Sequence, residues 1–291
     1  MPLLTKSKLI NNTLTFKYRH CRRVVFWLKS TEMVPVVQSV LFALDQHNQS
    51  VLPDNIEILK NTPVNKRLIF RIKMPTEESF VVKVLTLHLF RLRLKYWYMK
   101  HHRYRFAEAA NLIIANKRGL RVPQVHGYGR IHGPSGLIKK DMVILEDLNN
   151  HISFNELLEQ NKANKQECIN ILNRLIPVFV SHYKAMCNNW DINTSSVIFD
   201  RDNPEHPPYV LDFEHIVFLK KSSLENLMFL AAKFAAGFPG WMSKEVVYSW
   251  AAEILNPLNI EDVNEKKNLV KRFGYYLNLP YMPHRQRMRI R

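Results

Sequence analysis

The sequence predicts an α+β protein in which a small antiparallel sheet precedes a mainly helical half. Three short apolar runs, at residues 67–73, 80–85 and 141–147, are bounded by polar residues or proline, as strands commonly are. After Glu146 the apolar residues recur at helical spacing instead. Strands in one part of a chain and helices in the next favour an α+β architecture. With 291 residues the chain is long enough for two such parts.

We expect three segments along the chain. Residues 1–54 form an N-terminal extension whose role the sequence does not indicate, although the apolar run at 34–44 predicts a short helix. Residues 55–147 form the sheet-containing lobe. Residues 148–291 form the helical lobe, which ends in a basic tail from His284 to Arg291.

The helical lobe begins with a capping pattern. Ser153 and Glu156 stand three residues apart, the spacing of a capping box at a helix N-terminus. Apolar residues at helical spacing then predict a long helix over 165–186, which contains Pro177. The same spacing predicts three further helices, over 222–238, 243–255 and 261–277.

The composition indicates an anionic partner. Hydrophobic residues (46%) and charged residues (23%) occur at ordinary levels, but 42 Lys and Arg against 25 Asp and Glu give a net charge of +17. Nucleic acid, a phosphorylated substrate and an anionic membrane surface all fit this charge. The sequence carries no zinc-finger, RRM, KH or basic-zipper signature, so no specific nucleic-acid partner is expected. The oligomeric state is not indicated.

Cysteine usage and hydropathy favour a cytoplasmic protein. Cys21, Cys168 and Cys187 are widely spaced and form no CxxC pair, so we expect free thiols in a reducing compartment. Charged residues interrupt the first 29 positions, and no apolar run is long enough to span a bilayer. Peripheral contact with the inner membrane remains open.

One basic and aromatic segment runs from Leu87 to Arg105 and contains no carboxylate. It is either the solvated face of a helix or a contact with an anionic membrane surface, made by aromatic anchors together with Lys and Arg. Since the whole chain is strongly basic, we favour the membrane contact.

Two aspartates stand at the edges of short apolar runs. Asp191 precedes the run at 197–199, Asp212 follows the run at 209–211, and a proline-containing turn at 200–208 lies between the runs. Two strands joined by this turn would bring both aspartates to one end of a hairpin. Paired carboxylates can bind a divalent metal and accept a proton, whereas the plainer reading is that both are turn residues.

Upstream, a lysine and a glutamate stand on consecutive elements. Lys83 lies within the strand-like run 80–85, where it either faces solvent or points toward a phosphate. Glu108 lies in the first turns of an amphipathic helix that ends at Gly119, where a carboxylate suits the helix dipole.

This order of elements resembles the two-lobed protein-kinase-like fold, with a small antiparallel N-lobe and a mainly helical C-lobe. The resemblance implies that Lys83 and Glu108 form an ion pair that positions the phosphates of ATP. It further implies that Asp191 is the catalytic base and that Asp212 binds Mg²⁺. Glu146 to Leu148 would then connect the lobes and contact the nucleotide.

A narrower resemblance is to bacterial lipopolysaccharide core kinases, the heptose and Kdo kinases. It rests on V-V-K-V, the basic aromatic segment, and A-E-A-A-N-L-I-I-A-N-K-R-G-L-R-V-P-Q-V. It implies ATP-dependent phosphorylation of a sugar hydroxyl on an anionic, lipid-linked core intermediate at the cytoplasmic membrane face. A small-molecule kinase of the aminoglycoside or choline type and a catalytically inactive kinase-like binding protein are the alternatives.

The chain departs from the kinase pattern at several positions. No glycine precedes Gly119, so only the connections at 63–66 and 74–79 could cover the phosphates as a glycine-rich loop does. Asn189 replaces the usual histidine before the base. Ser196 replaces the second metal-binding asparagine, for which Asn193 could substitute.

Overall fold

The computed structural model describes residues 12–18, 21–46, 52–62, 67–98 and 104–279. The chain divides into two units. The first comprises Met1–Ile114 and Pro123–Leu148, and the second comprises Ala115–Val122 and Asn149–Arg291. The basic tail expected at 284–291 lies outside the described residues.

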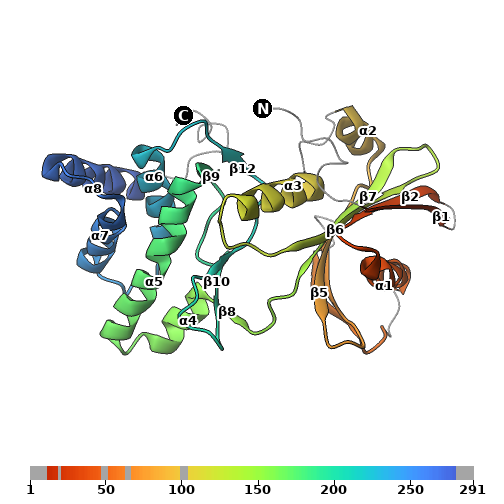
Figure 1. Cartoon of the computed structure of the whole chain (residues 1–291), viewed down its shortest axis with the longest axis horizontal. Coiled ribbons are helices and arrows are strands. Elements are labelled where there is room, and N and C mark those ends of the chain that lie inside the picture. The colour runs from red at the N-terminus through yellow and green to blue at the C-terminus, as the bar shows by residue number, and fades with distance from the viewer. Residues whose placement is uncertain (1–11, 19–20, 47–51, 63–66, 99–103, 280–291) are drawn as a thin grey trace. The chain divides into compact units, whose positions relative to one another are not determined.

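The first unit is built on a seven-stranded sheet whose paired neighbours are all antiparallel (Figure 1). The strand order is β1-β2-β6-β7-β5-β4-β3. Side chains alternate along β4 between buried and more exposed positions, as expected for a strand with one face on the core. The strands are β1 (Asn12–Tyr18), β2 (Cys21–Leu28), β3 (Ile56–Thr62), β4 (Arg67–Lys73), β5 (Ser79–Thr86), β6 (Val125–His132) and β7 (Ile138–Glu146).

Several described residues before position 54 belong to the hydrophobic core beside this sheet. A short 3₁₀ turn (Thr31–Met33) leads into helix α1 (Val34–Gln46), which lies against the sheet (Figure 1). Val40 of α1 and Phe26 of β2 are fully buried in one cluster with Val82 of β5. A Cβ atom added at Gly129 on β6 would lie 2.3 Å from the Phe26 ring, so only glycine fits there. The expected N-terminal extension therefore supplies two strands and a helix to the first unit.

A short turn joins β6, which ends at His132, to β7, which begins at Ile138. Backbone hydrogen bonds from Gly133 N to Leu137 O and from Gly136 N to Gly133 O, both 2.9 Å, close the turn. Gly136 adopts φ = 76°, a conformation that glycine adopts without steric cost.

Two helices follow β5. Helix α2 (Phe90–Tyr98) contacts β7. Helix α3 (Tyr104–Lys117) begins in the first unit, and its residues from Ala115 onward belong to the second. Gly119, at φ = 82°, follows the end of α3 as the sequence predicted.

The second unit is mainly helical, with short strand pairs beside the helices (Figure 1). Its helices are α4 (Phe154–Asn161), α5 (Lys165–Lys184), α6 (Leu224–Ala235), α7 (Lys244–Glu253) and α8 (Val263–Leu277), with a 3₁₀ turn at Asn256–Leu258. Its strands are β8 (His151–Ser153), β9 (Cys187–Asn189), β10 (Val197–Asp200), β11 (Tyr209–Val210) and β12 (Ile216–Phe218).

Caps and aromatic packing fix these helices. The capping box of Ser153 and Glu156 forms as predicted at the start of α4. Side chains of Asn164, Ser223, Ser243 and Asp262 cap the other four helices, each cap being worth about 1 kcal/mol. Between the helices, the rings of Phe179 and Phe234 lie 5.4 Å apart, and Trp250 lies 5.3 Å from Phe179.

The α+β prediction is confirmed, with the sheet in the first unit and most helices in the second. Within the described ranges, no helix combines the length and the apolar content needed to cross a bilayer. The thiols of Cys168 and Cys187 are free, as expected.

Candidate active site

Two antiparallel pairings bracket Asp191 and Asp212 within the second unit. The predicted hairpin forms, because Val197 of β10 pairs with Val210 of β11. A second pairing joins Asn189 of β9 to Ile216 of β12. Each aspartate thus lies in the short loop between a strand of one pairing and a strand of the other. The pairings hold the two loops at the same end of the hairpin.

Asp191 is held between two buried residues. Trp190 is 4% exposed and Ile192 is 1% exposed, so the backbone on both sides of the aspartate is fixed by packing. The Asp191 N–H donates to Oδ1 of Asn189 at 3.2 Å. Its side chain remains 36% exposed, which leaves the carboxylate accessible to a ligand. A fixed backbone with an accessible carboxylate suits a general base.

A lysine that the sequence analysis missed approaches this carboxylate. Nζ of Lys233, on α6, lies 3.9 Å from Oδ1 of Asp191. The side chain of Lys233 is 24% exposed, whereas its neighbours Ala232 and Phe234 are fully buried. One signal was present in the sequence, since Lys233 is the single charged residue in the apolar run 227–236. Only the fold shows that this run passes beside Asp191.

Asp212 adopts a strained backbone conformation. Its φ angle is 59°, and a left-handed conformation costs an L-residue with a Cβ roughly 1–2 kcal/mol. The next residue, Phe213, is fully buried and lies 6.3 Å from the His182 ring, measured between centroids. Burial of Phe213 therefore holds the exposed Asp212 in this conformation. Local strain of this kind tends to occur at functional positions.

His182 is a buried titratable group beneath this loop. Its Nδ1 lies 2.8 Å from the carbonyl oxygen of Val178. A carbonyl only accepts hydrogen bonds, so Nδ1 carries the proton in the neutral ring. Among the described residues, Nε2 has no hydrogen-bond partner. Burial lowers the pKa of His182 to about 4, because a second N–H would be buried without an acceptor.

Asn193 and Ser196, predicted as further metal ligands, lie in the turn after Asp191. Asn193 Oδ1 accepts from the Ser196 N–H at 3.1 Å and from the Ser195 hydroxyl at 2.6 Å. Ser196 is 1% exposed, and its hydroxyl donates to the Asn193 carbonyl at 2.8 Å. The oxygens of both side chains already have partners in the turn. Metal binding by Asn193 and Ser196 stays a prediction.

The ion pair implied by the resemblance forms in the first unit. Nζ of Lys83 lies 2.7 Å from Oε1 of Glu108, with Lys83 in β5 and Glu108 in α3. The Glu108 side chain is 1% exposed and that of Lys83 is 13% exposed. A buried pair at this distance is a charge-assisted hydrogen bond with a fixed geometry. Lys83 is therefore not an ordinary solvent-facing strand residue.

The segment predicted to contact the nucleotide, Glu146 to Leu148, follows directly from β7. Oε2 of Glu146 accepts from the backbone N–H of Gln124 at 3.0 Å. The Asp147 side chain, 2% exposed, accepts from Arg71 at 2.6 Å and 3.3 Å. Leu148 is half-buried. Side chains thus anchor this segment to the sheet, and contact with a nucleotide remains a prediction.

The two connections considered in place of a glycine-rich loop differ. Residues 63–66, between β3 and β4, lie outside the described residues. The connection between β4 and β5 is a tight turn closed by a 2.8 Å bond from Met74 N to Glu78 O, and Glu77 adopts φ = 65° in it.

The loop between β11 and β12 carries two carboxylates, those of Asp212 and Glu214. No cluster of three His, Cys, Asp or Glu side chains suited to a metal occurs among the described residues. Mg²⁺ usually needs only one or two carboxylates, and takes its other ligands from phosphates and water. Asp212 is exposed and Glu214 follows two positions later, so one or two carboxylates are at hand.

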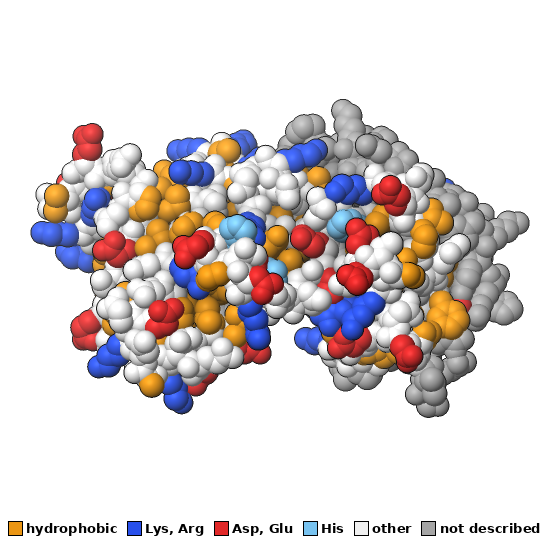
Figure 2. Space-filling model, turned by 60° about the horizontal axis from the view of Figure 1, so that its bottom comes forward, with side chains coloured by type: hydrophobic (Ala, Val, Ile, Leu, Met, Phe, Trp, Pro, Cys, Tyr) orange, Lys and Arg blue, Asp and Glu red, His pale blue; other side chains and the backbone are white. Residues whose placement is uncertain are grey.

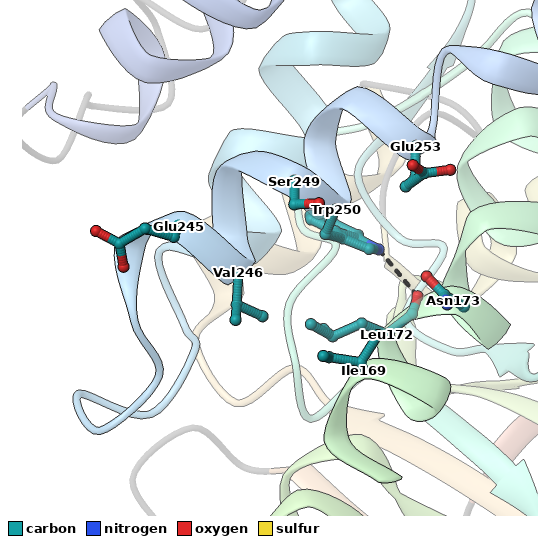
Figure 3. Close-up of a pocket in the computed structure, with 8 residues that line it drawn as sticks. All are labelled: Ile169, Leu172, Asn173, Glu245, Val246, Ser249, Trp250 and Glu253. Atoms are coloured by element: carbon teal, nitrogen blue, oxygen red, sulfur yellow. Dashed lines mark hydrogen bonds between the residues drawn. The ribbon is translucent and has the colours of Figure 1, made fainter. Parts of the chain in front are cut away.

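A pocket of about 370 Å³ lies elsewhere in the second unit, between α5 and α7 (Figure 3). Apolar side chains form its floor, and Trp250 Nε1 donates to the Leu172 carbonyl at 2.9 Å. The carboxylates of Glu245 and Glu253 stand at its sides (Figure 3). No predicted site residue lines this pocket.

Comparison with known proteins identifies the fold. No protein-family model and no curated protein sequence matches the chain. Among solved structures, WaaP in complex with acyl carrier protein matches with a TM-score of 0.52 and 10% sequence identity. The match covers 77% of this chain and 89% of that chain. The likeness confirms the two-lobed, kinase-like α+β fold predicted from the sequence.

Proposed function

We propose that the protein is an ATP-dependent kinase that phosphorylates a sugar hydroxyl on a lipid-linked lipopolysaccharide core intermediate at the cytoplasmic membrane face. The observation that carries this proposal is the buried 2.7 Å pair of Lys83 and Glu108. A lysine on the solvent side of a strand is hydrated by water. Lys83 is instead held by a carboxylate that is 1% exposed. The kinase-like fold and the bracketed aspartates support the same conclusion.

Each of these residues has a defined role in the proposed reaction. Lys83, held by Glu108, orients the α- and β-phosphates of ATP. Asp212 binds Mg²⁺, which neutralises negative charge on the phosphates. The acceptor hydroxyl oxygen bonds to the γ-phosphorus as the bond to the β-phosphate oxygen breaks and ADP leaves. Asp191 takes the hydroxyl proton, and most of the acceleration comes from positioning and charge neutralisation.

Lys233 adds a cation beside the base. At 3.9 Å from Oδ1 of Asp191, its ammonium group forms an ion pair with the carboxylate that accepts the proton. The same ammonium group can offset negative charge that develops on the transferred phosphoryl group. Lys233 thus supports the base from a helix distant in sequence.

The test is transfer of the γ-phosphate to dephosphorylated core oligosaccharide. Asp191→Ala and Lys83→Met are expected to abolish transfer, whereas Glu205→Ala, in the exposed turn after β10, is the matched control and retains it. Full activity in Asp191→Ala would refute the assignment of the base. Transfer to an aminoglycoside or choline, but not to the oligosaccharide, would show a small-molecule kinase instead.

A catalytically inactive, kinase-like binding protein is the second candidate. The observation that favours it is the turn at 193–196, which occupies both oxygens expected to assist the metal. A ligand that binds only the folded state raises thermal stability, by about 2.7 kcal/mol at 100 times its dissociation constant. Stabilisation by ATP with Mg²⁺ but no transfer to any acceptor would establish this alternative.

A further inference from the structure

Helix α2 and the residue before it expose a group of large apolar side chains. Leu89 is 64% exposed, Phe90 59%, Leu92 39% and Leu94 42%. These four residues of a six-residue span are among ten exposed large hydrophobics in the described part of the chain. Single exposed apolar residues are ordinary, but a contiguous group usually marks an interaction surface.

The helix is attached to the first unit at its start. Nε of Arg93 donates to the Leu87 carbonyl at 2.7 Å, and α2 contacts β7. Arg93 is half-buried, whereas Arg91 is exposed. The apolar residues therefore project from an anchored helix.

The charge of this segment favours an anionic surface as the partner. From Leu87 to Arg105 the sequence has six Lys and Arg residues and no Asp or Glu. Figure 2 shows, by contrast, that Lys and Arg are interspersed with Asp and Glu over the face in view. A second copy of the chain would bring the same basic residues against one another, which costs free energy. A bilayer with anionic headgroups both buries apolar side chains and neutralises the positive charge.

We propose that α2 is a membrane-docking helix, in which Phe90 and Leu94, one turn apart on the same side of the helix, enter the headgroup region of an anionic bilayer with the preceding Leu89, and Arg91 binds lipid phosphates. A helix with Leu and Phe beside Lys and Arg lies in the plane of the interface in this way. The proposal concerns binding alone and holds whether or not the protein is a kinase.

The experiment is flotation of the full-length protein with lipid vesicles. Vesicles of phosphatidylcholine with phosphatidylglycerol are expected to bind the protein, and vesicles of phosphatidylcholine alone to bind it far more weakly. Binding to the anionic vesicles falls as salt is raised, because salt screens the charges. Arg91→Glu, which reverses one charge, is expected to weaken binding at least fivefold. Leu89→Glu with Phe90→Glu removes the main apolar insertion and is expected to weaken it more than tenfold.

Matched controls come from α8, which exposes Val263 to 62% and Tyr275 to 59%. Val263→Glu and Tyr275→Glu add the same charge to equally exposed positions, and their binding should equal that of the wild type. Circular dichroism of every variant checks folding. If the apolar double variant misfolds, Arg91→Glu still tests the proposal, because it changes only a surface side chain.

Two outcomes would overturn the proposal. One is equal vesicle binding by the wild type and both α2 variants. The other is a change of oligomeric state in the α2 variants, measured by sedimentation, with vesicle binding unchanged, which would assign the apolar group to contact between copies of the chain.

Discussion

Removing the Lys83 ammonium group tests whether the ion pair in the first unit is a buried structural interaction. Lys83→Met keeps the length of the side chain but leaves the Glu108 carboxylate, 1% exposed, without its lysine. Breaking a buried pair from one side costs about 3–5 kcal/mol, because the remaining charge stays desolvated. The first unit has about 140 residues, so this corresponds to a fall of roughly 10–20 °C in its unfolding temperature.

A double-mutant cycle separates the cost of the desolvated Glu108 carboxylate from the loss of packing. Glu108→Leu in the Lys83→Met background removes the desolvated carboxylate, and replacing both partners of a buried pair is often nearly neutral. We expect the double variant to recover at least about 2 kcal/mol of stability relative to Lys83→Met, measured by denaturant unfolding. Lys73→Met, at an exposed strand end, is the control and changes stability by less than about 0.5 kcal/mol.

The reasoning fails if Lys83→Met unfolds within about 1 kcal/mol of the wild type. It also fails if the double variant is less stable than Lys83→Met, because the cost would then come from packing and not from the buried charge. Both variants should lack phosphoryl transfer, so stability and activity report separately on the structural and the proposed catalytic role.

Three further predictions concern the second unit. Lys233→Met should lower kcat for the proposed transfer by about 10²-fold, with Lys233→Arg restoring part of it. The free energy of unfolding of both Lys233 variants should differ from the wild type by less than about 1 kcal/mol, because the pair of Lys233 and Asp191 is partly exposed. Asp212→Gly should be about 1–2 kcal/mol more stable than Asp212→Ala in thermal unfolding, because φ = 59° suits glycine; equal stability would contradict the strain. Burial lowers the pKa of His182 from 6.5 to about 4, so the unfolded chain binds more protons between these pH values. The free energy of unfolding should then fall by about 3 kcal/mol from pH 6.5 to pH 4, and His182→Gln should lose that part of the pH dependence.

Local patterns in the sequence predicted much of the fold. The capping box at Ser153, the helices of the second unit and the β10–β11 hairpin depend on residues close in sequence, so spacing and turn chemistry predicted them. Their ends moved by a few residues, as at α5, expected over 165–186 and found at Lys165–Lys184. The fold class was predictable for the same reason.

Features that depend on long-range pairing were not predictable. Nothing near Asn189 indicates that β9 pairs with β12, although this pairing completes the bracket around both aspartates. Lys233, which lies beside Asp191 in the fold, stands 42 positions later in the sequence. The strained backbone of Asp212 arises from packing of Phe213, which only the folded core supplies. The place of the β1–β2 hairpin in the sheet was missed because β6, which pairs with β2, lies far along the chain.

The pairing of β2 with β6 has a consequence for how the chain folds during synthesis. Leu28 pairs with Gly127, so about 100 residues must follow the first hairpin before its partner strand exists. At a synthesis rate of ~5–20 residues per second, the hairpin remains without this partner strand for roughly 5–20 s. During this time Val24 and Phe26 are not yet covered by the completed core. Loop closure over such a separation is slow, and an unpaired apolar edge invites aggregation. The N-terminal strands are therefore the part of the chain for which a chaperone during translation matters most.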